Sequence, residues 1–320
     1  MVLRNVTAIK ILDQSFVYSS DDALAGSMVS VECFIGFWMI FAVIVGCHRI
    51  PALRSPFGIL MINQNITQLI ACLTSGSFFF LGVLLNIKVV LDHSNYFGNF
   101  SICLLPVVIG SFFLMSLNRF CASTMVFTYK TIFSNENIRR FIIFNWAFSG
   151  VFWLWVIVSR ECNFVFFHYG WIFTGDVYTE VCRDLVITYN TIVQLTITSL
   201  IFVLDVATLC ILVCWRGRVY KKQSATVRKR EMSFAGQVLI QGIVFFMHGF
   251  WYDMGYSWLP GNDERWKYFF TTSFSSNLLH IFDPLVVFLF NPEFRRWIIR
   301  FHHSAFKKNQ VTAVVSAISS

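Results

Sequence analysis

The sequence has 320 residues, of which 56% are hydrophobic, 18% aromatic and only 13% charged, whereas soluble domains carry about twice that share of charge. The net charge of +8 suits nucleic-acid binding, but the basic residues stand between long apolar runs rather than on one soluble face, which excludes a nucleic-acid partner. The composition therefore predicts an all-α membrane protein.

The apolar residues gather in seven long runs. A helix needs about 20 apolar residues to cross a bilayer core of about 30 Å, and each run meets that requirement. The pattern predicts a seven-transmembrane helix bundle. The predicted spans are residues 23–47, 57–85, 97–118, 141–159, 185–214, 232–252 and 268–290.

The runs divide the chain into an extracellular tail over 1–22, a membrane domain over 23–300 and a cytoplasmic tail over 301–320. The first tail lacks the apolar core and cleavage site of a removable signal peptide. Most of the 25 basic residues fall inside if the N-terminus lies outside and the C-terminus inside, which is the orientation that the positive-inside rule favours. Asn5, followed by Val6 and Thr7, is then an outer N-glycosylation acceptor.

The third run carries no charged side chain until Arg119, which follows Asn118. A guanidinium at the end of a span can reach the lipid headgroups and fix the topology. If Arg119 lies at the inner end of a central helix, the five N–H donors of its guanidinium can also bind backbone carbonyls of a partner.

Three acids interrupt the spans. Asp283 stands directly before Pro284, while Glu32 and Asp205 lie in the first and fifth runs. Because an intramembrane acid is costly, we expect each of them to face the bundle and to have a partner. Pro284 lacks a backbone N–H and loosens its helix locally.

Five blocks of the sequence resemble the nematode serpentine chemoreceptors of the Srx class, which have rhodopsin-like architecture. The blocks occur in the order and at the spacing that this family shows. Individually each block is short, but together they extend over about residues 30 to 300. The blocks are SPFGILMINQNI from Ser55, NRFCA from Asn118, YKTIFS from Tyr129, RKREMSFAGQVLIQG from Arg228 and FFTTSFSSNLLHIFDPLVVFLFNPEFR from Phe269.

This resemblance implies a G-protein-coupled chemosensory receptor in the cell membrane, in a sensory neuron or cilium, without a cofactor. An external small molecule or peptide would bind it, and the C-terminal helix of a Gα subunit would dock inside. Asp283 and Pro284 would form a conformational switch, and the basic inner loop would also attract anionic membrane lipids. The implied G-protein coupling residues are Asn118, Arg119, Tyr129, Arg228, Lys229 and Arg230.

Two further groups of residues follow from the resemblance. His248, Trp251, Tyr252 and Phe274 lie toward the outer halves of the sixth and seventh spans, where they are candidates to line a ligand pocket. Cys162 and Cys182 flank an aromatic outer loop on the oxidising side of the membrane, so we expect a disulfide between them. The alternative pairs Cys182 with Cys103 of the third span.

The chain also departs from related receptors. Ile40 and Val126 replace an Asn and a Pro that the class tends to carry, and Gln68 stands near the position of a rhodopsin-like acid. These changes argue against a rhodopsin-like sodium site, and they leave open a receptor with weakened signalling. Asn118 replaces the acid that restrains the neighbouring Arg in rhodopsin-like receptors, which predicts higher basal activity.

Two other function classes find little support in the sequence. A transporter or channel would show a repeated half with interrupted helices, and the sequence shows no such repeat. A seven-helix membrane hydrolase would hold zinc, for which His248, His280 and Asp283 are the only candidates. The spacing of these three residues fits a zinc site poorly, so no metal site is expected.

Overall fold

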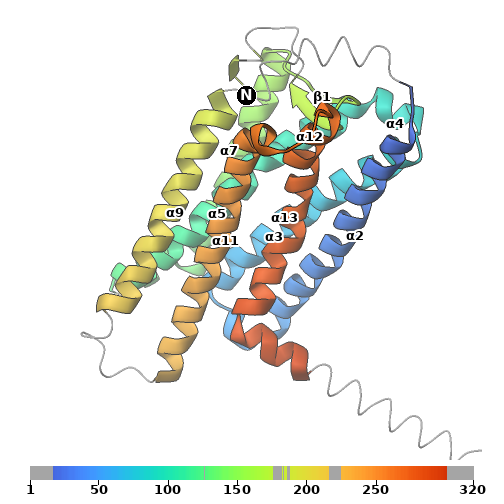
Figure 1. Cartoon of the computed structure of the whole chain (residues 1–320). Coiled ribbons are helices and arrows are strands. Elements are labelled where there is room, and N and C mark those ends of the chain that lie inside the picture. Colours follow the sequence, from blue (N-terminus) through green and yellow to red (C-terminus); the bar gives the residue numbers. More distant parts are fainter. Residues whose placement is uncertain are drawn as a thin grey trace, which may run out of the picture.

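The structure is a computed structural model that describes residues 17–125, 127–175, 182, 184–185, 188–215 and 225–300. Within these ranges, seven helices are long and apolar enough to cross a membrane, which confirms the predicted bundle. They run side by side along one direction, as Figure 1 shows. Asn5 and Val126 lie outside the described residues.

The helices of the bundle are capped by residues that the sequence places at their starts. Ser55 and Ser134 precede their helices, and each side chain accepts a hydrogen bond from a backbone N–H of the first turn, as N-caps do. Pro56 occupies the first helical position, where its missing N–H costs nothing. The long helices are α2 (Ser20–Arg49), α3 (Pro56–Phe78, continued by η3, Phe79–Leu84), α5 (Ser94–Thr124), α7 (Asn135–Ser159), α9 (Leu195–Cys210, preceded by η4, Thr188–Gln194, and followed by η5, Ile211–Trp215), α11 (Ala225–Trp258) and α13 (Ser273–Phe290).

The third and seventh spans differ from their sequence predictions in ways that bear on the site. The third helix does not end at Arg119 but continues to Thr124, because Cys121, Ser123 and their neighbours present no helix-breaking residue. The seventh span is two helices, α12 (Glu264–Thr271) and α13, separated at Thr272, whose backbone leaves the helical region.

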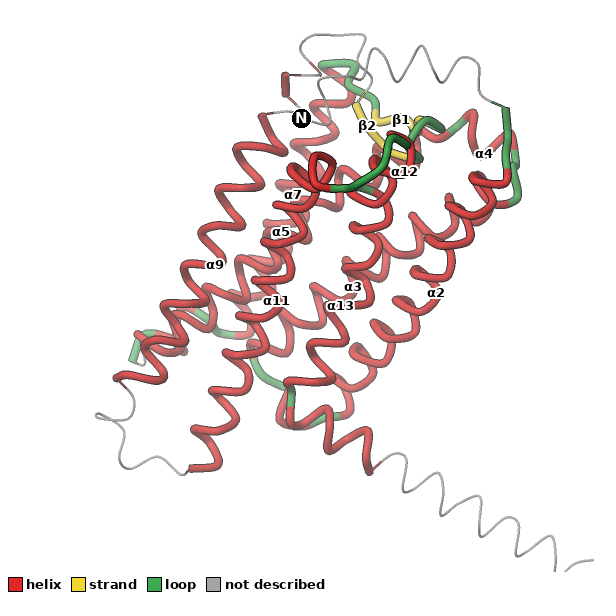
Figure 2. The backbone as a smooth tube through the Cα atoms, in the orientation of Figure 1, coloured by secondary structure: helices red, strands yellow, loops and turns green. Residues whose placement is uncertain are grey.

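A small β-hairpin closes one end of the bundle, and we call this end the hairpin end. Strand β1 (Phe164–Phe167) pairs antiparallel with β2 (Ile172–Gly175), so that Phe164 faces Gly175. The turn places Gly170 at φ +91°, a conformation that glycine adopts without strain. Figure 2 shows the strands lying next to α12 at this end. The opposite end, where α5 carries Arg119, is called the Arg119 end.

Short elements complete the described chain. They are η2 (Pro51–Leu53), α4 (Lys88–Asp92), α6 (Tyr129–Ile132) and a helix over residues 292–300. Asn291 caps the last of these by accepting from the backbone N–H groups of Glu293 and Phe294. Phe294 is fully buried against Gly46 of α2, which anchors the helix to the bundle.

The outer surface of the bundle is apolar. Helix α7 exposes Phe144, Phe148, Val151 and Leu154, each at least 60% exposed. A soluble protein rarely presents so large an apolar face, whereas a lipid environment requires it. The exposed belt therefore agrees with a multi-pass membrane protein.

Candidate functional site

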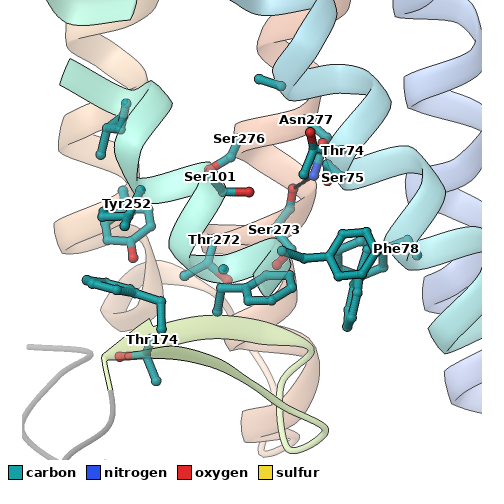
Figure 3. A pocket seen from close by; sticks show the side chains of 18 of the residues that line it. Thr74, Ser75, Phe78, Ser101, Thr174, Tyr252, Thr272, Ser273, Ser276 and Asn277 are labelled. Carbon is teal, nitrogen blue, oxygen red and sulfur yellow. Dashed lines mark hydrogen bonds between the residues drawn. The ribbon is translucent and has the colours of Figure 1, made fainter. Parts of the chain in front are cut away.

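A cavity of about 250 Å³ lies under the hairpin. Helices α3, α5, α11 and α13 supply its walls, and Phe164, Phe173 and Thr174 of the hairpin close one side. In Figure 3, hydroxyl and amide groups such as Ser101 and Ser276 face the space between the helices. We call this space the outer cavity.

A second cavity of about 160 Å³ continues deeper into the bundle. It shares His248, His280 and Ser276 with the outer cavity, so these residues form the boundary between the two spaces. The imidazole Nε2 of His248 lies 3.2 Å from the Ser276 hydroxyl oxygen. Asp283 lines only the deeper space, which we call the inner cavity.

The four predicted ligand residues separate into two pairs. His248 and Tyr252 line the outer cavity, while Trp251 and Phe274 do not. The indole N–H of Trp251 donates to the carbonyl oxygen of Phe270 at 3.1 Å, and Phe274 packs edge-on against the Phe270 ring. Both side chains therefore hold α11 and α13 to the α12 region instead of facing a ligand.

Asp283 is almost fully buried and lies in a cradle of amide groups. Its Oδ2 accepts hydrogen bonds from Gln64 Nε2 at 2.9 Å and Gln68 Nε2 at 3.1 Å, while its Oδ1 accepts from Gln241 Nε2 at 2.6 Å. The carboxylate thus joins α3, α11 and α13. The expectation that this acid faces the bundle with partners is confirmed, and the partners are amides rather than a basic residue.

The amide network continues toward the Arg119 end. Gln237 donates to Gln241 Oε1 at 3.3 Å, and its own Oε1 accepts from Asn291 Nδ2 at 3.2 Å. All of these side chains are buried. A chain of hydrogen bonds therefore links Asp283, beside the inner cavity, to Asn291 at the start of the last helix.

Arg119 lies between two aromatic rings, one from α3 and one from α11. Its guanidinium carbon is 3.6 Å from the ring centroid of Phe57 in α3 and 4.8 Å from that of Phe234 in α11. Both distances are in the range of a cation–π interaction. The aromatic pair thereby connects α5 to α3 and α11 at the end where the sequence predicts coupling.

The structure brings two further predicted coupling residues together. Asn118 is fully buried, and its amide donates to the Tyr129 hydroxyl at 3.1 Å. Arg228, Lys229 and Arg230 lie in the first turns of α11, but their side chains are outside the part of the structure that is described.

Of the other two intramembrane acids, Glu32 differs from the expectation of a partner within the described residues, whereas Asp205 lacks one at a single oxygen. Both are buried, but the carboxylate of Glu32 and the Oδ2 of Asp205 have no hydrogen-bond partner among the described residues. Asp205 Oδ2 instead lies 2.5 Å from the place where a Cβ on Gly242 would stand. A side chain at position 242 would therefore displace the Asp205 carboxylate.

The proposed zinc ligands do not form a metal site. Within the described residues, no group of three or more His, Cys, Asp or Glu is placed to hold a metal ion. Asp283, which that hypothesis needs as a ligand, already accepts hydrogen bonds from three amides.

The segment that carries the hairpin contains the expected disulfide. Cys162 is bonded to Cys182, with Cα atoms 5.2 Å apart, within the usual range for disulfides. Cys103 is a free cysteine in α5, so the alternative pairing is wrong. The bond ties the start of β1 to the segment before η4.

Replacing either cysteine of this bond with serine should lower the amount of receptor at the cell surface several-fold. A disulfide that closes a loop of this size contributes about 3 kcal/mol. Cys162→Ser, Cys182→Ser and the double variant should have equal effects because all three remove the same bond, while Cys103→Ser should leave expression unchanged. Antibody labelling of intact cells measures this, and additive losses would contradict it.

A buried ion pair fastens the hairpin to the bundle. Asp22 Oδ1 accepts from the Trp171 indole at 2.8 Å and from Arg265 Nη2 at 3.1 Å. The Arg265 guanidinium also lies 4.3 Å from the Trp171 ring centroid. These residues come from α2, the hairpin turn and α12, and we call them the clasp. Beside it, Tyr169 donates to Glu264, and burial together with the Glu264 charge raises the pKa of Tyr169.

Asp22→Ala should lower the melting temperature of the purified receptor and its surface level. The change leaves the buried indole N–H of Trp171 without its acceptor and removes the charge opposite Arg265, a loss of about 2 to 4 kcal/mol. The neighbouring Asp21→Ala is the matched control and should behave like the wild type. Equal effects of the two substitutions would show that the clasp contributes nothing specific.

Similarity to known proteins decides the family. The model of the family described as "Serpentine type 7TM GPCR chemoreceptor Srx" matches residues 31–291. The chain belongs to the Srx family. The Caenorhabditis elegans protein named Serpentine receptor class X-43 is 58% identical to this Srx chain over 317 residues, which cover 99% of both sequences. Serpentine receptor class X 45 of the same organism is 25% identical over 297 residues, covering 86% of this chain and 80% of that protein.

The fold of this Srx chain is similar to that of squid rhodopsin. The two structures superpose with a TM-score of 0.72 at 15% identity, over 91% of this chain and 88% of the other. At that identity the likeness shows the fold alone. Together with the family match, it confirms the prediction of a G-protein-coupled chemosensory receptor of rhodopsin-like architecture. The transporter, channel and hydrolase alternatives find no support among these relatives.

The amide network was not predicted from the sequence, in which Gln68 was noted only for its place near a rhodopsin-like acid. Gln64 and Gln68 are four residues apart on α3, as Gln237 and Gln241 are on α11. Residues at this spacing share one helix face, and polar groups in a span face the bundle interior. The two pairs therefore carried a signal for the amide network. The hairpin also had a signal, since Gly170 separates two short aromatic runs.

Proposed function

We propose that this Srx receptor lies in the cell membrane with its hairpin end and N-terminus outside. An external small molecule enters the outer cavity and changes the packing of α11 against α13 and α5. A heterotrimeric G protein reads that change at the Arg119 end, inside the cell. The orientation rests on the distribution of basic residues, since Arg228, Lys229 and Arg230 lie in the first turns of α11, at the Arg119 end.

One observation carries this proposal. Four residues of α11 lie on one helix face, and each contacts a different part of the path. His248 lines both cavities, Gln241 binds Asp283, Gln237 binds Asn291, and Phe234 packs against Arg119. A rotation or shift of α11 therefore alters the ligand cavity and the coupling end together.

The roles of individual residues follow from their places on this path. Asp283 and Pro284 act as the conformational switch, because the amide network meets there. Arg119, with Asn118 and Tyr129 beside it, receives the C-terminal helix of Gα. Arg228, Lys229 and Arg230 extend α11 toward the same partner and toward anionic lipid headgroups.

The proposed function also includes glycosylation of the N-terminal tail and a sensory location. Asn5 carries an N-linked glycan on the outer tail. The receptor is expressed in a sensory neuron and concentrated in its cilium, where an external chemical signal arrives first.

The proposal is tested by expressing the chain in cells that carry a promiscuous Gα subunit and a calcium reporter, and by screening small volatile and water-soluble molecules. An active compound should lose potency with His248→Ala while reaching the same maximum. With Gln241→Leu it should bind but give a reduced maximum. A compound whose response is indifferent to both substitutions would contradict the assigned path.

A further inference from the structure

The outer cavity has no charged lining. Its walls, as far as the structure describes them, contain no Asp, Glu, Lys or Arg. Asp283 lines only the inner cavity, and its oxygens already accept three amide hydrogen bonds. Moving an ion from water into such a space without an opposite charge is costly. The cavity therefore selects neutral molecules over amines and carboxylates.

Three hydroxyl groups of this cavity use their protons in hydrogen bonds within the protein. Thr74 donates its hydroxyl proton to the Ile70 carbonyl at 2.8 Å, and Thr272 donates to the Tyr268 carbonyl at 2.6 Å. Ser273 donates to the Trp171 carbonyl at 2.5 Å. A hydroxyl has one proton and two lone pairs, so each of these three oxygens keeps acceptor capacity after its proton is used.

The side-chain amide of Asn277 also uses its hydrogen-bonding groups within the protein. Asn277 donates through Nδ2 to the Ser273 carbonyl at 2.7 Å, as the dashed line in Figure 3 shows, and its Oδ1 accepts from the Cys33 thiol at 3.3 Å. The hydroxyl protons of Thr74, Thr272 and Ser273 and the amide of Asn277 thus point into the protein. We call these four side chains the polar belt. A ligand that supplies its own O–H or N–H meets the lone pairs that remain.

One flank of the cavity is aromatic. Phe78 is fully buried, and its ring centroid lies 5.2 Å from that of Phe97 and 4.7 Å from that of Phe173. All three rings line the cavity. Figure 3 shows Phe78 on one side of the polar belt and Tyr252 on the other. Aromatic rings favour the edge and face contacts of another ring, so this flank suits a flat aromatic body.

The volume limits the size of the ligand. About 250 Å³ lies below the roughly 300 to 1,000 Å³ of pockets that hold drug-sized molecules. A single ring or a fused pair with a short substituent fits this space, whereas a peptide does not.

We propose that the outer cavity binds a small neutral aromatic molecule that donates a hydrogen bond, such as a phenol or an indole. This inference rests on the proposed function, because it assumes that the cavity is the ligand site. The ring packs against Phe78 and Phe97, and the O–H or N–H is directed at the hydroxyl oxygens of Thr74, Thr272 and Ser273.

The test measures binding to the purified full-length receptor by thermal stabilisation in detergent. The compounds are a set of single-ring phenols and indoles, with para-ethylphenol, its methyl ether para-ethylanisole, para-ethylbenzoate and para-ethylbenzylamine as the matched series. We expect the phenol to bind at least about tenfold more tightly than its ether, because a site with buried acceptors discriminates against a ligand that lacks the proton. The acid and the amine should bind more weakly still.

A substitution locates the binding site. Thr74→Val keeps the side-chain shape, removes the acceptor oxygen and should weaken binding of the phenol about three- to tenfold, with little effect on the ether. Thr67→Val is the matched control. Thr67 is buried two turns away on α3, makes the same kind of bond to the carbonyl four residues before it, and does not line the cavity.

Each remaining result would overturn part or all of the proposal. Equal binding of phenol and ether would remove the donor requirement, and tighter binding of the acid or the amine would remove the neutrality requirement. Failure of every phenol and indole to stabilise folded receptor, or equal losses with Thr74→Val and Thr67→Val, would reject the site. Binding without a response in the reporter cells would count against the proposed signalling function and leave the ligand class standing.

Discussion

Asp283→Ala should reduce the folded receptor at the cell surface several-fold and abolish the response of what remains. The substitution removes the acceptor of three buried amide donors, from Gln64, Gln68 and Gln241. Interhelical hydrogen bonds in membrane proteins contribute about 0.6 to 1.7 kcal/mol each, so the loss is about 2 to 5 kcal/mol. A loss of this size is a large part of the free energy of unfolding of a folded protein. The substitution also removes the one point at which α3, α11 and α13 are joined by the Asp283 carboxylate. Surface labelling and melting temperature measure the effect, with Asp92→Ala in the exposed part of α4 as the control.

A double variant, Asp283→Asn with Gln241→Glu, moves the acid from α13 to α11. It tests whether the pairing of donors and acceptors in the network stabilises the bundle. Asp283→Asn places an N–H₂ group opposite the Gln241 amide, so two donors face each other. Adding Gln241→Glu supplies an acceptor for that group, while the new amide oxygen at position 283 still accepts from Gln64 and Gln68. Gln237 can also continue to donate to position 241. The double variant should therefore recover most of the stability that Asp283→Asn loses. Additive losses would show that the hydrogen-bond geometry described for Asp283 is not what holds the helices.

The sequence was sufficient for the fold because the signal for a membrane span is length and apolar composition, and both are local. It was not sufficient for the faces of the helices. In a soluble protein an amphipathic pattern shows which side of a helix is buried, but here lipid-facing Phe144 and core-facing Trp153 of α7 are equally apolar. The rotation of each helix is set by packing and by a few polar contacts, which the sequence alone does not pair.

The candidate site shows the same division. Arg119, Asn118 and Asp283 stood out because charges and amides are rare in spans, and the structure places all three at interior contacts. Trp251 and Phe274 were chosen for their chemistry and depth, but depth does not determine direction, and they point at α12 and its neighbours. Thr74 and Ser273 were missed because hydroxyls are common in spans and bond to nearby carbonyls. Only the surrounding helices make them a cavity wall.

Phe234→Leu should raise ligand-independent signalling about two- to thirtyfold. Because Asn118 replaces the usual acid beside Arg119, the sequence predicts a weak restraint and a measurable basal signal. The structure supplies a restraint of another kind, since Arg119 lies over Phe57 and against Phe234. A cation–π contact contributes about 0.5 to 2 kcal/mol, and removing one that favours the resting arrangement shifts the population by the corresponding factor. Basal reporter activity, normalised to surface level, measures the shift.

The matched control is Phe246→Leu, which removes an equal ring from α11 where it packs on Phe202, far along the helix from Arg119. It should leave the basal signal unchanged. Arg119→Ala should abolish both basal and ligand-driven signalling while the receptor stays at the surface, because the guanidinium is the group that binds the Gα helix. In that background, Phe234→Leu should add nothing. If Phe234→Leu raised the signal without Arg119, the ring would act through helix packing alone, and a normal response of Arg119→Ala would remove this residue from the coupling path.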